Sequence, residues 1–272
     1  MRALLLSSLL LAAFLCRPAF GGDIHAAVQK GDLEAIRTLL TANPALINAQ
    51  TVMVGEWWLN GTPLHWASCA GQKDVVELLL AHNADVNARA QVTRATPLHC
   101  AAGFGRTEVA ELLLAHGSRV DGRDNDQNAP LHMAAGNHDR ELIELLLADQ
   151  PKIFEKDKEG KMQQRVVMAW DVREVIELLL ANKAEVDARN KRGRTPLHVA
   201  AEFGNTSVIE QLLSHGADMD ARDKERNTPL GVALDSRKRT AETEIAHKAE
   251  RLKALGDAID LLRARGATRS WP

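Results

Sequence analysis

The chain has 272 residues, of which 45% are hydrophobic and 26% are charged, and its formal net charge is −2. This composition is ordinary for a soluble protein, and three cysteines exclude a scaffold built from disulfides. There is no strong basic excess to attract nucleic acid or an anionic membrane surface. We therefore expect no nucleic-acid partner.

Residues 1–21 differ from the rest of the chain. Arg2 precedes an apolar run from Ala3 to Leu15, and the small-x-small pattern Ala19-Phe20-Gly21 follows. The run is too short for a comfortable membrane span, so the pattern predicts a secretory signal peptide. Its removal takes away Arg2 and Arg17 and leaves a formal charge of −4. We expect export to the periplasm or the extracellular space and no membrane insertion after cleavage; an uncleaved N-terminal anchor is the alternative.

A Thr-Pro-Leu-His motif, or a close variant of it, recurs through the remaining sequence. The spacings between successive motif prolines are 34, 33, 66 and 33 residues, for Pro63, Pro97, Pro130, Pro196 and Pro229. A period of this length indicates stacked supersecondary units. In each unit Thr offers a helix N-cap oxygen, and Pro takes the first helical position, where its missing N–H costs nothing. A second helix follows, and a polar stretch leads to the next motif.

These features resemble the ankyrin repeat over about residues 23–267. The resemblance implies an all-α solenoid of stacked helix pairs, with β-hairpin-like fingers on one side. It also implies a protein partner bound by the fingertips and by the concave face of the inner helices. We expect one domain over residues 22–272, a monomer, with units near 23–50, 51–89, 90–123, 124–156, 157–189, 190–222 and 223–267.

The unit at 157–189 departs most from the pattern. Met162–Arg165 stands where the motif belongs, and Val167 and Met168 replace paired alanines. These changes predict an inner helix that is bulkier and less well capped than the others. The outer-helix pattern then returns in register at Val175–Leu180.

We expect no catalytic residue, no metal site and no cofactor. The resemblance implies that one histidine per unit hydrogen-bonds within its own unit and to the adjacent finger; these are His65, His99, His132 and His198. Their spacing is not that of a zinc site. His138 and Asp139 are adjacent, but the local sequence marks no nucleophile as their partner.

Cys69 and Cys100 fall on neighbouring inner helices, one turn out of step. Such helices lie about 8–10 Å apart, so we expect the two thiols to be beyond easy disulfide reach.

Partner recognition is expected where side chains depart from the repeat or face outward. Trp57 and Trp58 lie in a lengthened finger, and Trp is enriched among residues that dominate binding energy. Alternatively, one or both tryptophan side chains fold back over the first unit, which caps the N-terminal end of the stack. A row of aromatic residues, Phe104, Trp170 and Phe203, is expected near the concave face. This aromatic row serves recognition, or its side chains pack against neighbouring helices. The expected partner-binding residues are Trp57, Trp58, Trp66, Phe104, Asn137, Trp170, Phe203 and the finger charges Arg94, Arg192 and Arg194.

The last unit contains a charged insertion from about Ser236 to Gly256. Apolar residues fall on one stripe at Ile245, Leu252, Leu255, Ile259 and Leu262. The pattern predicts an extended final helix pair whose polar face caps the stack. A docking helix for a partner is the alternative.

The predicted function is that of a non-enzymatic protein–protein interaction module of the periplasm or extracellular space. An accessory or protective factor for an exported enzyme, for example in oxidative stress, is an alternative that predicts one stoichiometric enzyme partner. A third hypothesis places an enzyme site in the degenerate unit, where the polar residues of the inner helix are Gln163, Gln164, Arg165 and Asp171.

Overall fold

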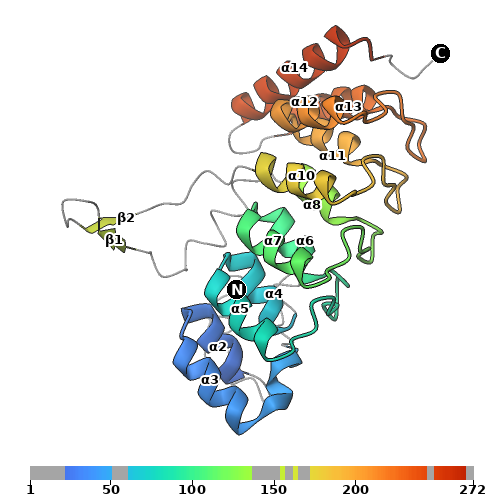
Figure 1. Cartoon of the computed structure of the whole chain (residues 1–272). Helices are drawn as coiled ribbons and strands as arrows, with labels where there is room; N and C mark the ends of the chain where they lie inside the picture. Colours follow the sequence, from blue (N-terminus) through green and yellow to red (C-terminus); the bar gives the residue numbers. More distant parts are fainter. Residues whose placement is uncertain are drawn as a thin grey trace, which may run out of the picture.

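The computed structural model describes residues 22–50, 61–136, 154–156, 162–164, 172–243 and 248–267. These residues form an elongated α-solenoid (Figure 1). Its elements are α2 (Gly22–Lys30), α3 (Leu33–Ala42), η1 (Pro44–Asn48), α4 (Pro63–Ala70), α5 (Lys73–Ala81), α6 (Pro97–Gly103), α7 (Thr107–Ala115), α8 (Pro130–Ala135), β1 (Phe154–Lys156), β2 (Met162–Gln164), α10 (Val172–Ala181), α11 (Pro196–Phe203), α12 (Thr206–Ser214), α13 (Pro229–Glu242) and α14 (Lys248–Ala264). The expected all-α repeat solenoid is confirmed.

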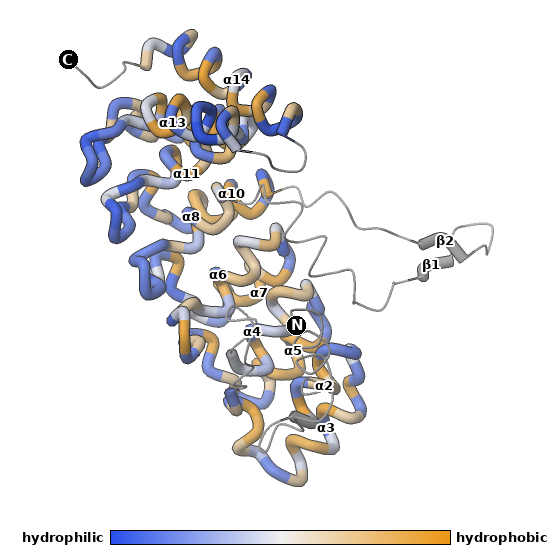
Figure 2. Tube along the Cα trace, turned by 180° about the vertical axis from the view of Figure 1, so that it is seen from behind, coloured by the Kyte–Doolittle hydropathy of each residue, from blue (hydrophilic) through white to orange (hydrophobic). Residues whose placement is uncertain are grey.

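The helices are arranged in an inner and an outer row. The inner row is α2, α4, α6, α8, α11 and α13, and each inner helix contacts the next. The outer row is α3, α5, α7, α10, α12 and α14, with the same neighbour-to-neighbour contacts. The hydrophilic fingers project along one side of the stack, and the helices carry the apolar residues (Figure 2).

The motifs that begin at Thr62, Thr96 and Thr195 build the start of an inner helix in the same way. The Thr96 hydroxyl lies 2.9 Å from His99 Nδ1, and the Thr96 backbone N–H donates to the same nitrogen at 3.1 Å. His99 Nε2 lies 3.0 Å from the carbonyl oxygen of Asn128 in the next finger. Because a carbonyl can only accept, Nε2 carries the proton and Nδ1 is the acceptor. The histidine therefore ties each helix start to the following layer, as the resemblance implied.

The core is continuous along the stack because every layer supplies the same buried positions. The leucine of each motif is fully buried, at Leu64, Leu98, Leu131 and Leu197. Paired alanines such as Ala101 and Ala102 are also fully buried, and their small size lets successive inner helices approach closely. No layer buries its apolar face alone, so stability is shared between neighbours.

The layer built on α8 differs from the expected arrangement. α8 contacts α10 as its outer partner and α11 as the next inner helix. His132 Nε2 lies 3.0 Å from the Arg194 carbonyl oxygen, 62 residues further along the chain. The equivalent bond of His198 reaches Asn227, 29 residues further along. A Cβ on Gly136 would come within 3.1 Å of Val199 Cγ1 in α11. The α8 layer and the α11 layer thus stack directly on one another.

These contacts correct two expectations about residues 157–189. α10 supplies the outer helix of the α8 layer, and among the described residues no further layer lies between α8 and α11. Met162–Gln164, expected at the start of an inner helix, forms strand β2, which pairs antiparallel with β1 in the register Phe154↔Gln164. Without Thr, Pro or a capping histidine there, the local signals for a helix start are missing. Val167 and Met168 lie outside the described residues.

Deleting residues 140–172 should leave the stack intact. The sequence of residues 140–148, RELIELLLA, closely matches REVIELLLA at residues 173–181, so the deletion joins Asp139 to Arg173 in register. It also restores a spacing of 33 residues between Pro130 and Pro196, since their present spacing is 66. We expect the free energy of unfolding, measured by denaturant titration, to change by only about 1 kcal/mol, because Val172 is the one described core residue that the deletion removes and the other described contacts between layers remain.

Deleting residues 97–129, which removes an equally long and complete layer, is the matched control. It should lower the free energy of unfolding by about 3 kcal/mol or more, the contribution of two buried leucines. Equal destabilisation by the two deletions would show that residues 140–172 contain a layer of the stack.

The stack ends in the extended final helix pair that the sequence predicted. α13 has 14 residues and α14 has 17, whereas α11 and α12 have 8 and 9. Leu255, Ile259 and Leu262 of the expected stripe are fully buried. α14 lies directly on the turn after α11, where a Cβ on Gly204 would come within 2.7 Å of the Ala254 carbonyl carbon. Gly204 also has φ 75°, a conformation that glycine adopts without strain.

Candidate functional site

The histidine row belongs to the scaffold. Burial lowers the pKa of His65 and His132 to about 4, against an ordinary value of 6.5. Burial also lowers the pKa of His99 and His198. All four side chains are less than 5% exposed. They are therefore neutral at pH 7, with both ring nitrogens engaged by the chain, and none faces a solvent-accessible site.

Cys69 and Cys100 lie on the neighbouring inner helices α4 and α6, and both are free. The neighbouring Cys100 thiol, together with burial, raises the pKa of the Cys69 thiol well above its ordinary value. That the two thiols lie beyond easy disulfide reach stays a prediction.

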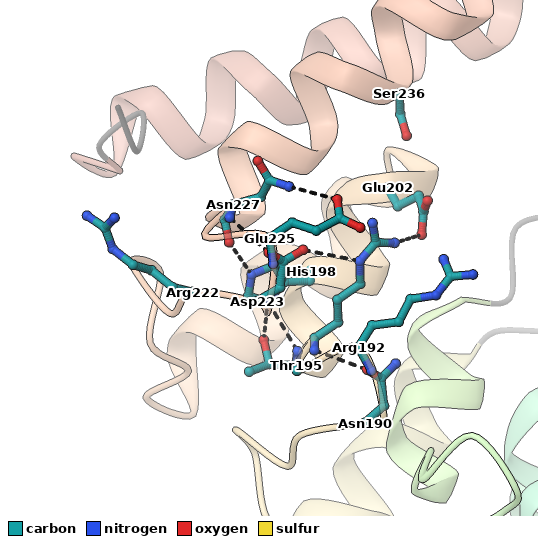
Figure 3. A network of polar contacts seen from close by, with 12 residues as sticks. Asn190, Arg192, Thr195, His198, Glu202, Arg222, Asp223, Glu225, Asn227 and Ser236 are labelled. Carbon is teal, nitrogen blue, oxygen red and sulfur yellow. Dashed lines mark hydrogen bonds and ion pairs between the residues drawn. The ribbon is translucent and has the colours of Figure 1, made fainter. Parts of the chain in front are cut away.

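An ion-pair network links the finger before α11 to the last finger. Arg194 Nη1 lies 2.7 Å from Glu202 Oε2, and Arg194 Nε lies 3.4 Å from Asp223 Oδ2. Figure 3 shows Asp223 and Glu202 in this network. Arg194 is only 8% exposed. It was expected to present a fingertip charge, but the two carboxylates hold its guanidinium inside the stack, so Arg194 acts as a structural residue of the finger.

A pocket of about 390 Å³ opens beside this network, where α11, α13 and α14 meet. We call it the C-terminal pocket. Its lining includes Glu202 and Phe203 of α11, Ser236, Arg239 and Thr240 of α13, and Arg251 of α14. Phe203, a residue of the predicted aromatic row, thus meets the charged insertion of the last unit in one cavity.

The charged groups of the C-terminal pocket are held in a defined arrangement. Arg239 Nη2 lies 3.4 Å from Glu202 Oε1 and donates to Ser236 Oγ at 3.1 Å. The Arg251 guanidinium carbon lies 5.8 Å from the centre of the Phe203 ring. At that distance a cation is attracted by the negative face of an aromatic ring. The pocket therefore combines an aromatic floor with two guanidinium groups and one carboxylate.

Trp66 is the expected partner-binding residue nearest the N-terminal end of the described stack. It lies on α4, is partly buried, and its ring meets that of His25 edge-on at a centroid distance of 5.9 Å. Its indole Nε1 is buried and has no hydrogen-bond partner among the described residues. A buried indole N–H usually finds an acceptor, so Trp66 remains a candidate for partner contact.

The remaining aromatic candidates are not brought together by the described residues. Phe104, after α6, and Phe203, at the end of α11, are both partly buried and belong to layers on either side of α8. Their association in one recognition stripe stays a prediction. Trp57, Trp58, Asn137 and Trp170 lie outside the described residues.

Two finger residues are exposed as expected, Arg94 and Arg192. Arg94 has φ 60°, in the left-handed region that favours glycine, and Gly193 occupies the equivalent position of a later finger with φ 75°. A non-glycine residue in this region costs of order 1 kcal/mol. Arg94 therefore presents a long cationic side chain at a position where glycine would be less strained.

Two exposed apolar residues were missed by the sequence analysis as recognition candidates. Met133 on α8 is 39% exposed, and Val92 in a finger is 48% exposed. Met133 falls in the same row of inner-helix positions as Trp66 and Cys100, so its periodicity could have identified it. Val92 carries no comparable signal, because finger sequences do not repeat closely enough.

Over the described ranges, no group of three or more His, Cys, Asp and Glu side chains could hold a metal ion. No helix in the same part of the chain is long and apolar enough to cross a membrane.

Comparison with known proteins agrees with the geometry. The family model for ankyrin repeats matches residues 24–90, 89–157 and 166–248. Palmitoyltransferase AKR1 of Naumovozyma castellii is 38% identical over 69 residues, which is 25% of this chain and 8% of that protein. The match thus spans a small part of the length of this curated relative. Ankyrin repeats are protein–protein interaction modules, and the repeat model covers most of the sequence: the chain belongs to the ankyrin-repeat family.

Proposed function

We propose that the chain is an exported, non-enzymatic module that binds a protein partner through its fingertips and the concave face of its inner helices. The observation that carries the proposal is the state of the histidine row. Its four members, residues typical of catalytic and metal sites, are buried and bonded within the scaffold, at distances near 3.0 Å to the next finger. What the stack offers to other molecules is a fixed surface.

The apolar segment at residues 1–21 supports export, and the protein acts as a monomer in the periplasm or outside the cell. The chain needs no cofactor, since binding uses only side chains already held by the stack. The family's mode of interaction supports a protein as the partner. The palmitoyltransferase relative does not argue for an enzyme here, because the match covers only 8% of its length.

Affinity capture from the exported fraction tests this function. The full chain, tagged at its C-terminus, is compared with a Trp57→Ala/Trp58→Ala variant, with Arg94→Ala and with Phe203→Ala. His116→Gln on the exposed outer surface is the control. We expect wild type and His116→Gln to retain the same protein, and at least one finger or concave-face variant to lose it. If all variants stay folded and retain every partner, the surface is not the binding site.

A further inference from the structure

We propose that the C-terminal pocket binds an acidic side chain of the partner together with an apolar neighbour, so that the partner is recognised through an acidic peptide segment. This inference rests on the proposed function, since it names the chemistry of the protein partner.

The floor of the pocket suits an apolar group. Phe203 is partly buried, and the Arg251 guanidinium lies over its ring. Ser236 and Thr240, which also line the pocket, are only 4% and 5% exposed. A cavity of about 390 Å³ accommodates two amino-acid side chains. An apolar side chain packed beside Phe203 brings its neighbour within reach of Arg239 at the rim.

The rim suits a carboxylate. The Arg239 side chain is 63% exposed. Its ion pair with Glu202, at 3.4 Å, is longer than the 2.7 Å ion pair that Glu202 forms with Arg194. Arginine presents parallel N–H groups that match a carboxylate in a bidentate pair. Arg239 therefore has donors directed to solvent beside the aromatic floor.

The surrounding charge favours the same ligand. α13 and α14 contain seven basic and five acidic residues, whereas the whole chain has an excess of acidic residues. A local positive field attracts an acidic segment and raises its association rate. The pocket wall is also fixed, because Gly204 allows α14 to lie directly against α11. A pocket formed before binding reduces the ordering cost of the complex.

Fluorescence anisotropy with labelled peptides tests the proposal. The probes are the acidic peptide Gly-Leu-Glu-Leu-Glu-Gly and its counterpart with Gln in place of Glu. We expect the full chain to bind the acidic peptide at least about tenfold more tightly, with weaker binding at higher salt. Arg239→Gln and Phe203→Ala should each weaken acidic-peptide binding about tenfold. Lys253→Gln is the matched control, since Lys253 lies on the same helix pair with a side chain 78% exposed and outside the pocket.

Three results would overturn the proposal. They are equal binding of the two peptides, equal loss of acidic-peptide affinity in Lys253→Gln and Arg239→Gln, and competition by free glutamate as effective as competition by unlabelled peptide.

Circular dichroism establishes that each variant is folded. If capture of a protein partner survives in Arg239→Gln but is lost in Arg94→Ala, the interaction function stands and the pocket assignment fails. If no variant changes capture while the peptide assay succeeds, the proposed function fails instead.

Discussion

Lowering the pH from 7 to 5 should destabilise the folded protein by about 4 kcal/mol through His65 and His132 alone, because burial lowers the pKa of each to about 4. Between pH 6.5 and 4 the unfolded chain binds protons at these sites that the folded chain does not. The stabilisation is therefore complete above pH 6.5 and is lost as the pH falls through this range. Each shift corresponds to about 2 kcal/mol at pH 5, and the lowered pKa values of His99 and His198 act in the same direction.

Denaturant titrations at several pH values measure this effect. The double variant His65→Gln/His132→Gln should be less stable at pH 7 but should lose less stability on acidification. His116→Gln removes an exposed histidine outside the capping row and serves as the control. A free energy of unfolding that stays constant from pH 7 to 5 would contradict the neutral, buried histidines of this fold.

Replacing Asp223 by alanine should lower the free energy of unfolding by about 3–5 kcal/mol, the usual loss when one partner of a buried ion pair is removed. The Asp223 side chain is 1% exposed and accepts from Arg194 Nε at 3.4 Å. It also accepts from the backbone N–H groups of Glu225 and Asn227, at 2.9 and 2.8 Å. The substitution leaves all three donors without this acceptor.

Asp124→Ala provides the matched control in an earlier finger. Asp124 accepts from the backbone N–H groups of Asp126 and Asn128, both at 2.8 Å, in the same turn geometry. Among the described residues it forms no ion pair with an arginine, and it is only half-buried. Its loss should cost about 1–2 kcal/mol, as for a turn or capping hydrogen bond. Comparable losses in the two variants would mean that the Arg194–Asp223 pair contributes little to stability.

The fold was predictable because its signals are local and repeated. Thr at the N-cap, Pro at the first helical position and a histidine two residues after Pro recur in most layers, and each of them makes the same contacts in the structure. The extended final pair was predictable for a similar reason, since the stripe of Leu255, Ile259 and Leu262 has helical spacing and is buried.

The stacking of the α8 layer was not predictable from the same signals. Residues 140–148 and 173–181 have nearly identical outer-helix sequences, so periodicity alone cannot tell which of them lies beside α8. The contact between His132 and Arg194, 62 residues apart, decides the order of the layers. A contact at that separation depends on packing that the local pattern does not contain.

The candidate site was predictable in part. The position of Phe203 follows from the repeat, whereas its cavity requires α13 and α14 to converge on α11. Arg194 looked like an exposed finger charge because fingers are polar, but two carboxylates from different layers hold it in the interior.

The claim that this chain works as a recognition surface is tested most directly by hydrogen–deuterium exchange on the full chain, with and without its captured partner. We predict added protection in the fingers and in α11, α13 and α14 around the C-terminal pocket, with little change in the outer helices α5, α7 and α10. Protection confined to the outer helices, or no protection in a saturated complex, would contradict it.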